Sequence, residues 1–255
     1  MNILAIGDIV GKSGLEMLNK HLRALKKLKD ISFVIANGEN ANGLGLTKGQ
    51  AEAIFSAGVD VITLGNHTFH VREIGRYLDE NEFILRPANL APQAPGRGAG
   101  VFWAGGVKIK VINLIGRCMM DFGPDNPFLE ADRLIKDNDA KITVVDFHAQ
   151  ATSEKNAMGY YLDGRVSAVF GTHTHVQTAD ERVNPKKTGY ISDLGMTGPS
   201  VSVLGIRPEQ SIAFFRGDLP PRFETAPGDA MLCGAIFEID ETNGLCLSVE
   251  RVSIK

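Results

Sequence analysis

The fold of this chain is decided by the stretch Arg165-Val166-Ser167-Ala168-Val169-Phe170-Gly171-Thr172-His173-Thr174-His175. The part before Gly171 is mostly apolar and β-branched, which predicts a buried strand that ends at the glycine. Residues i and i+2 of an extended chain point the same way, so we expect the rings of His173 and His175 to converge on one point. Neutral imidazole is the commonest metal ligand in proteins, so a metal site is one interpretation. The other interpretation is a pair of surface histidines in a polar loop.

Four more predicted strands also end in polar residues. The strand at residues 3–6 leads to Gly7-Asp8, that at 33–36 to Asn37-Gly38-Glu39-Asn40, that at 59–64 to Gly65-Asn66-His67, and that at 142–145 to Asp146-Phe147-His148. Ligands bind outside the carboxyl ends of the strands in open α/β sheets. Each group alone has a structural explanation, such as a helix cap for Asp8, a turn for Asn66 or a core position for His148. Five strand ends with oxygen and nitrogen donors favour one shared site.

The other segments are predicted as follows. A helix with a leucine stripe follows the turn at 11–14, and Thr47 with Gln50 forms a capping-box pattern that begins a helix at 47–57. Residues 71–78, 127–136 and 153–162 are expected to be helical, and 107–115 is expected to be a strand. Residues 231–239 and 245–254 form a predicted hairpin that turns at 241–244. Cys233 and Cys246 lie on its two strands but too far out of register to face each other.

Composition excludes several classes of protein. The chain has 255 residues, of which 44% are hydrophobic and 22% charged, with a formal net charge of -3. We therefore expect one globular domain over residues 1–255 and no partner of duplex nucleic acid, which requires a basic surface. Three cysteines without a Cys-x-x-Cys motif indicate reduced thiols and a cytoplasmic protein. No apolar run is long enough to cross a bilayer, so no membrane partner is expected.

The order of these motifs resembles that of the calcineurin-type metallophosphoesterases, and their amino-acid sequences are more similar to those of the YmdB-like branch. The blocks that carry the resemblance are Ile6-Gly7-Asp8-Ile9-Val10-Gly11, Asn37-Gly38-Glu39-Asn40-Ala41, Thr63-Leu64-Gly65-Asn66-His67, Asp146-Phe147-His148-Ala149, Gly171-Thr172-His173-Thr174-His175-Val176-Gln177-Thr178-Ala179-Asp180 and Gly195-Met196-Thr197-Gly198-Pro199. The resemblance implies an α/β fold, a two-sheet (αββα) sandwich flanked by helices. It also implies a dinuclear metal centre and a metal-dependent phosphodiesterase in which a metal-bridging hydroxide attacks phosphorus. For the YmdB-like branch it implies 2′,3′-cyclic nucleotides as substrates.

The resemblance assigns the site residue by residue. The first metal takes Asp8, Glu39, Asn40 and His175. The second metal takes Glu39, Asn66, His148 and His173. His67 is left without a metal and is expected to be catalytic, stabilising phosphate oxygens or protonating the leaving group. Iron or manganese is favoured for the two ions, and zinc also suits these donors.

The chain departs from the wider superfamily at three positions. Val10 stands where a metal-binding histidine is usual, and Asn40 is the expected substitute ligand. Glu39 replaces the usual bridging aspartate, and Thr68 replaces the acid that often orients the histidine of Asn-His. What holds the ring of His67 is therefore open, and His70 is expected to be peripheral.

Two alternatives from other classes remain open. An amidohydrolase-type barrel also uses His-x-His, but near its first strand. A metal-containing regulatory or sensor protein would bind nucleotide phosphates with little turnover. For an enzyme, the expected partner is a small phosphodiester, and homo-oligomer formation is left open. The loops at 86–100, 116–127 and 195–223 are the expected pocket walls, with Arg117 and Arg207 as phosphate contacts.

Overall fold

The strands form two sheets in a computed structural model that describes residues 1–121, 123–136, 139–219 and 222–255. Within these residues the first sheet has the order β2-β12-β13-β1-β3-β4-β5, with β14 beside β13, and the second has the order β10-β11-β9-β8-β7-β6. The strands of the first sheet are β1 (Asn2–Ile6), β2 (Asp8–Ile9), β3 (Ile31–Asn37), β4 (Val61–Thr63), β5 (Ile84–Leu85), β12 (Met196–Pro199), β13 (Ala230–Ile239) and β14 (Cys246–Ile254). Those of the second are β6 (Ala99–Ala104), β7 (Val107–Ile115), β8 (Ile142–His148), β9 (Ala168–Thr172), β10 (Arg182–Val183) and β11 (Gly189–Ile191). Two open sheets exclude the barrel alternative.

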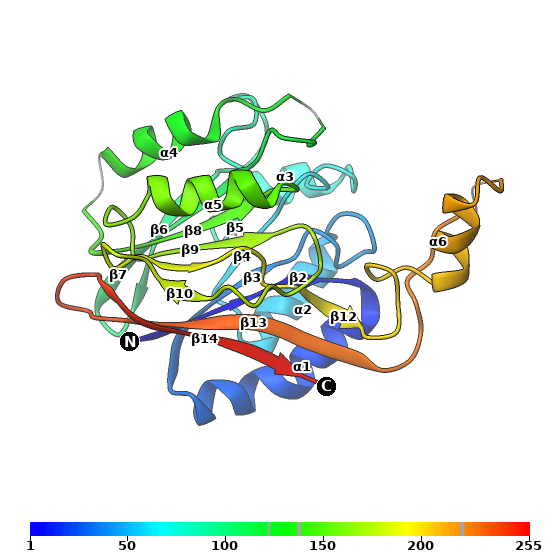
Figure 1. Cartoon of the computed structure of the whole chain (residues 1–255), viewed down its shortest axis with the longest axis horizontal. Coiled ribbons are helices and arrows are strands. Elements are labelled where there is room, and N and C mark those ends of the chain that lie inside the picture. The colour runs from blue at the N-terminus through cyan, green and yellow to red at the C-terminus, as the bar shows by residue number, and fades with distance from the viewer. Residues whose placement is uncertain (122, 137–138, 220–221) are drawn as a thin grey trace.

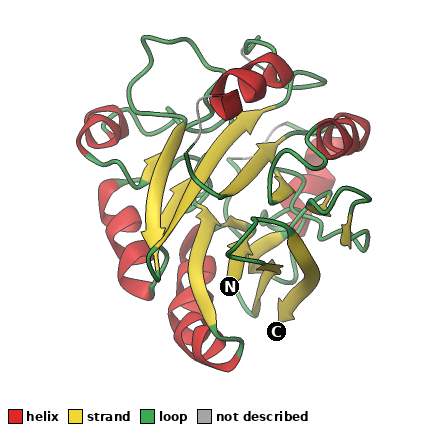
Figure 2. Ribbon diagram, turned by 90° about the vertical axis from the view of Figure 1, so that its left-hand side faces the viewer, coloured by secondary structure: helices red, strands yellow, loops and turns green. Residues whose placement is uncertain are grey.

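Helices cover the outer face of each sheet. These helices are α1 (Gly11–Leu28), α2 (Lys48–Ala57), α3 (Ile74–Glu80), α4 (Pro127–Lys136) and α5 (Thr152–Tyr161), and the described residues also form α6 (Pro208–Phe215). Figure 1 shows α1 below the strands and α4 and α5 above them, and Figure 2 shows the same layers from the side. Helix α6 stands apart from the body of the molecule (Figure 1). No helix of the described ranges combines the length and the apolar character that a bilayer crossing requires.

Three apolar clusters fill the spaces between these layers. Alternation along β1 sends Leu4 and Ile6 to the cluster under α1 and α2, and Ile3 and Ala5 to the cluster between the sheets. The third cluster lies between the second sheet and helices α4 and α5, and includes Phe147. The expected two-sheet αββα sandwich is therefore confirmed.

The strands that carry the predicted site run parallel within each sheet. Strand β3 pairs in parallel with β1 and β4, and β8 pairs in parallel with β7 and β9. Their carboxyl ends therefore meet at one edge, which places the polar strand-end residues together.

Most of the predicted elements are present, and the differences have local causes. The capping box of Thr47 and Gln50 is formed, and the hairpin pairs Cys233 with Ser253 and Cys246 with Ile239, so the two thiols do not face each other. Helix α3 begins later than the predicted residue 71. Strands β2, β5, β6, β10 and β12 and helix α6 were not predicted. The short strands β2 and β12 pair with each other across the chain, so their own sequences carry little signal.

Candidate metal centre

The structure brings the predicted ligands to one edge of the two sheets. Asp8 begins β2, Glu39 and Asn40 follow β3, and Asn66 and His67 follow β4. His148 is the last residue of β8, and the two histidines of His-x-His follow β9. Asp8, Glu39 and His148 are fully buried, although they are polar. Buried polar groups of this kind require partners, and here the partners are mainly one another.

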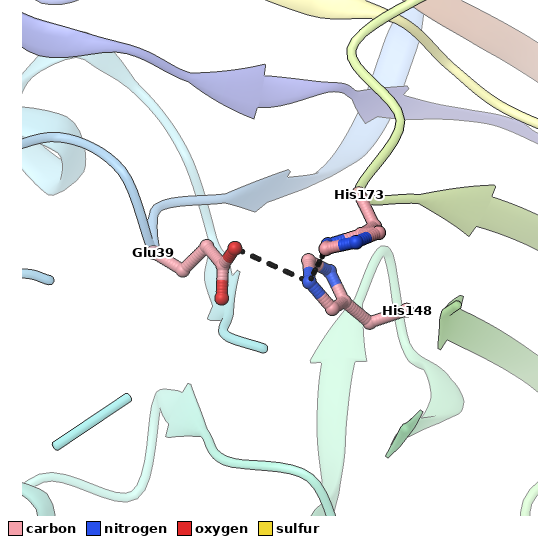
Figure 3. A group of neighbouring side chains, drawn as sticks. All are labelled: Glu39, His148 and His173. Atoms are coloured by element: carbon pink, nitrogen blue, oxygen red, sulfur yellow. Dashed lines mark hydrogen bonds and ion pairs between the residues drawn. The ribbon is translucent and has the colours of Figure 1, made fainter. Parts of the chain in front are cut away.

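Glu39, His148 and His173 form the tightest group. Their ligand atoms lie within 4.8 Å of one another, and the three side chains point toward a common centre (Figure 3). The Nε2 atom of His148 lies 3.2 Å from Oε1 of Glu39 and 3.1 Å from Nδ1 of His173. Asn66 joins this group, because its Oδ1 lies 2.9 Å from the same Nε2 atom. This arrangement matches the donor set expected for the second metal.

Asp8, Asn40 and His175 form a second group next to Glu39. Nε2 of His175 lies 3.8 Å from Oδ1 of Asp8 and 3.0 Å from Nδ2 of Asn40. The same Nδ2 lies 3.3 Å from Oε1 of Glu39, so Glu39 contacts both groups. The amide NH2 of Asn40 faces its neighbours here, and a ligand role requires the amide to turn so that Oδ1 faces them. Val10, at the position of the missing histidine, is buried and lines a pocket together with Glu39, Asn40 and His175.

Each of the three imidazoles has its second nitrogen bonded away from the centre. Nε2–H of His173 donates to Oε1 of Gln150 at 3.0 Å, and Nδ1–H of His175 donates to the carbonyl of Leu204 at 3.0 Å. Nδ1 of His148 lies 2.9 Å from the hydroxyl of Thr172. The bonds of His173 and His175 leave one unprotonated nitrogen of each ring facing the centre, which is the tautomer that a metal requires.

The electrostatics of the centre favour a cation. Burial raises the pKa of Asp8, and its Oδ1 is buried without a hydrogen-bond partner. Burial alone would lower the pKa of His148, but the carboxylate of Glu39, with smaller effects of other carboxylates, raises it to about 9. Burial alone would raise the pKa of Glu39, but the ring of His148 lowers it to about 2. Positive charge is therefore stabilised between these groups, and the residues fit a metal ion, which would displace the proton of His148.

The loop of His173 and His175 is not extended, contrary to the prediction. The two residues have φ angles of 97° and 62°, in the left-handed region. The rings therefore reach the centre through a tight turn and join different groups. Thr174 between them is held by Oδ2 of Asp193, which accepts from its backbone N at 3.1 Å and its hydroxyl at 2.7 Å. Such bonds hold a backbone in a sparsely populated conformation.

His67 is held by its neighbours in place of the missing acid. Its Nε2 lies 3.2 Å from Nδ2 of Asn66, and its Nδ1 lies 3.3 Å from Nδ1 of His70. The two histidine rings meet edge to face at 4.6 Å, so the expectation of a peripheral His70 is wrong. The hydroxyl of Thr68 donates to the carbonyl of Gly65 instead. Burial lowers the pKa of His67, which favours the neutral ring.

Two hollows adjoin the centre. A pocket of about 230 Å³ lies over the ligands and is lined also by His67, Leu204 and Ile206. A mostly apolar hollow of about 460 Å³ shares Asn66 with the centre. Its remaining lining residues are Gly65, Thr68, Phe69, His70, Leu90, Ala91 and Ala94.

Of the expected walls, the loops at 86–100 and 195–223 contribute to these hollows, whereas no described residue of the loop at 116–127 does. Residues 122, 220 and 221 of these loops lie outside the described residues. Neither of the predicted arginines lines a hollow at the centre. Arg117 is exposed, and Arg207 forms ion pairs with Glu224 and Glu209.

The sequence prediction missed the residues that hold the ligands in place. They are Gln150, Thr172, Asp193 and, beneath the centre, Asp146. Three of these lie within two positions of a predicted histidine ligand, and alternation along a strand could have indicated Asp146 beside His148. Asp193 carries no such signal, because its contact with Thr174 depends on how the second sheet folds.

Comparisons with known proteins identify relatives of this chain in sequence and in fold. The family model described as "YmdB-like protein" matches residues 4–252. A relative from Bacillus subtilis (strain 168), named 2′,3′-cyclic-nucleotide 2′-phosphodiesterase, is 46% identical over 258 residues, covering 100% of this chain and 97% of the relative. The crystal structure of a novel phosphatase from Mycoplasma pneumoniae has a TM-score of 0.95 at 38% identity and covers 100% of this chain and 93% of its own. A 5′-nucleotidase precursor from Thermus thermophilus has a TM-score of 0.59 at 12% identity and covers 100% of this chain and 54% of its own, a likeness that shows the fold alone.

Proposed function

The chain belongs to the YmdB-like family, and on this premise we propose that it is a dinuclear-metal phosphodiesterase that hydrolyses 2′,3′-cyclic nucleotides. The observation that carries the proposal is the convergence of three imidazoles and two buried carboxylates, with an unprotonated nitrogen of His173 and of His175 toward the centre. Such a donor set suits iron, manganese or zinc. The name of the Bacillus subtilis relative supports the substrate class.

We assign the ligands to two ions. Asp8, Asn40 and His175 would hold one ion, and Asn66, His148 and His173 would hold the other. Glu39 would bridge the two, since its Oε1 lies close to both groups. Bound ions of this kind neutralise charge on phosphoryl oxygens and lower the pKa of water.

The chain itself supplies the other functions of the site. The neutral ring of His67 lines the pocket and has no place in either ligand group, so it is available to hydrogen-bond a phosphate oxygen or to transfer a proton. The apolar hollow beside Asn66 is large enough for a nucleobase. The exposed ring of Phe69 offers a stacking surface there, and stacking on an aromatic ring is worth about 1–3 kcal/mol per base.

The test combines metal analysis with a substrate panel. Protein purified without chelator should contain two metal ions per chain and should hydrolyse 2′,3′-cyclic AMP to a nucleoside monophosphate. A content of one ion or none would overturn the dinuclear centre. Faster cleavage of linear nucleic acid or phosphoproteins would overturn the substrate class. Tight binding of 2′,3′-cyclic AMP with no hydrolysis would identify a regulatory protein instead.

A further inference from the structure

Beneath the candidate metal centre lies a carboxylate, Asp146, that contacts no substrate pocket. Asp146 is fully buried on β8, two residues before His148 and on the same face of the strand. Its Oδ1 accepts from the hydroxyl of Thr172 at 2.7 Å. Its Oδ2 accepts from the hydroxyl of Thr63 at 2.5 Å and from Nδ2 of Asn37 at 3.4 Å. One carboxylate thus joins the ends of strands from both sheets.

The hydrogen bond from Thr172 to Asp146 determines that Nδ1 of His148 carries a proton. A hydroxyl has one proton, and the proton of Thr172 is donated to Asp146. The Thr172 oxygen can therefore only accept in its 2.9 Å contact with Nδ1 of His148, so this nitrogen carries a proton. Nε2 of the same ring is then the nitrogen that a metal can take, and it is the atom that faces Glu39 and His173.

We propose that Asp146 and Thr172 form a relay that positions the His148 ring and fixes its tautomer for metal binding. Carboxylates often bond directly to the second nitrogen of a metal-binding histidine, and losing such a partner typically weakens metal affinity about 10–100-fold. Here a threonine hydroxyl stands between the carboxylate and the ring. The inference rests on the proposed metal centre, but it concerns residues outside both ligand groups.

Thr63 provides a matched control for Thr172. Both threonines are fully buried, both end a strand, and each donates one hydroxyl to Asp146. Of the two, only Thr172 contacts His148 through its side chain. Replacing either with the isosteric valine removes one donor from Asp146, so Thr63→Val shows what the loss of such a donor alone does.

The experiment measures zinc affinity by competition with a chromophoric chelator, together with thermal unfolding of each metal-free protein. Thr172→Val should bind zinc about 10–100-fold more weakly than the wild type, whereas Thr63→Val should stay close to it. Thr172→Ser retains the hydroxyl and should restore the affinity. If Thr172→Val does not fold, Thr172→Ala paired with Thr63→Ala makes the same comparison.

The outcomes separate this inference from the proposed function. Equal zinc affinities in the two valine variants, or a serine variant as weak as Thr172→Val, would overturn the relay and leave the metal centre standing. A wild-type protein that takes up no zinc, iron or manganese would overturn the centre itself and the relay with it.

Discussion

Lys155 and Asp193 form a buried ion pair outside the ligand groups. Nζ of Lys155 donates to Oδ2 of Asp193 at 2.7 Å, and the two side chains are only 2% and 1% exposed. Asp193 also accepts from the backbone of Gly195 at 2.8 Å and holds Thr174 between the two histidines of the site. We expect Lys155→Met to damage both stability and the site.

The size of the stability loss in Lys155→Met follows from the burial of the ion pair. Methionine fills much of the same space but leaves the Asp193 carboxylate buried without its countercharge. Removing one partner of a buried pair typically costs about 3–5 kcal/mol. The pair of Arg76 and Glu80 is the matched control, because its side chains are 88% and 56% exposed. Pairs of that kind contribute little to stability, because water and salt screen their charges.

Urea unfolding of the metal-free proteins measures the loss of stability in both variants. Lys155→Met should lower the free energy of unfolding by about 3–5 kcal/mol, whereas Arg76→Met should leave it almost unchanged. The Lys155 variant should also bind metal more weakly, because the loop that carries His173 and His175 loses an anchor. Equal stability losses in the two variants would refute the argument from burial.

Four further predictions concern the centre. In Gly65→Ala the new Cβ would lie 2.3 Å from both Oε2 of Glu39 and Nε2 of His148, so metal content by elemental analysis should fall, and full retention would contradict the geometry. Asn40→Ala should lose one metal selectively and keep the fold; unchanged metal content would show that Asn40 is not a ligand. His67→Ala should keep both metals but lose about 10²–10⁴-fold in turnover, and near-normal turnover would make this residue a bystander. The pKa of His148 in the folded metal-free protein is about 9, against an ordinary value of 6.5. The free energy of unfolding should therefore fall as the pH rises from 6.5 through 9. A flat pH profile in urea unfolding would refute this.

Local patterns in the sequence determined the strands, most of the helices and the candidate ligands. The capping box of Thr47 and Gln50 could be predicted because both partners lie within one helical turn. The strand before Gly171 could be predicted because its β-branched apolar residues match a buried strand. Polar residues at five strand ends indicated a shared site because parallel strands end at one edge of a sheet.

The contacts among these residues depend on the packing of the two sheets, which the sequence patterns do not reveal. Strand geometry predicted an extended chain at His173 and His175, whereas the fold gives both residues a left-handed backbone. The pairing of Lys155 with Asp193 spans 38 residues, and that of Asp146 with Thr63 spans 83. No local pattern specifies such partners, because a buried polar group is satisfied by whatever donor the packing of the two sheets brings within hydrogen-bonding distance.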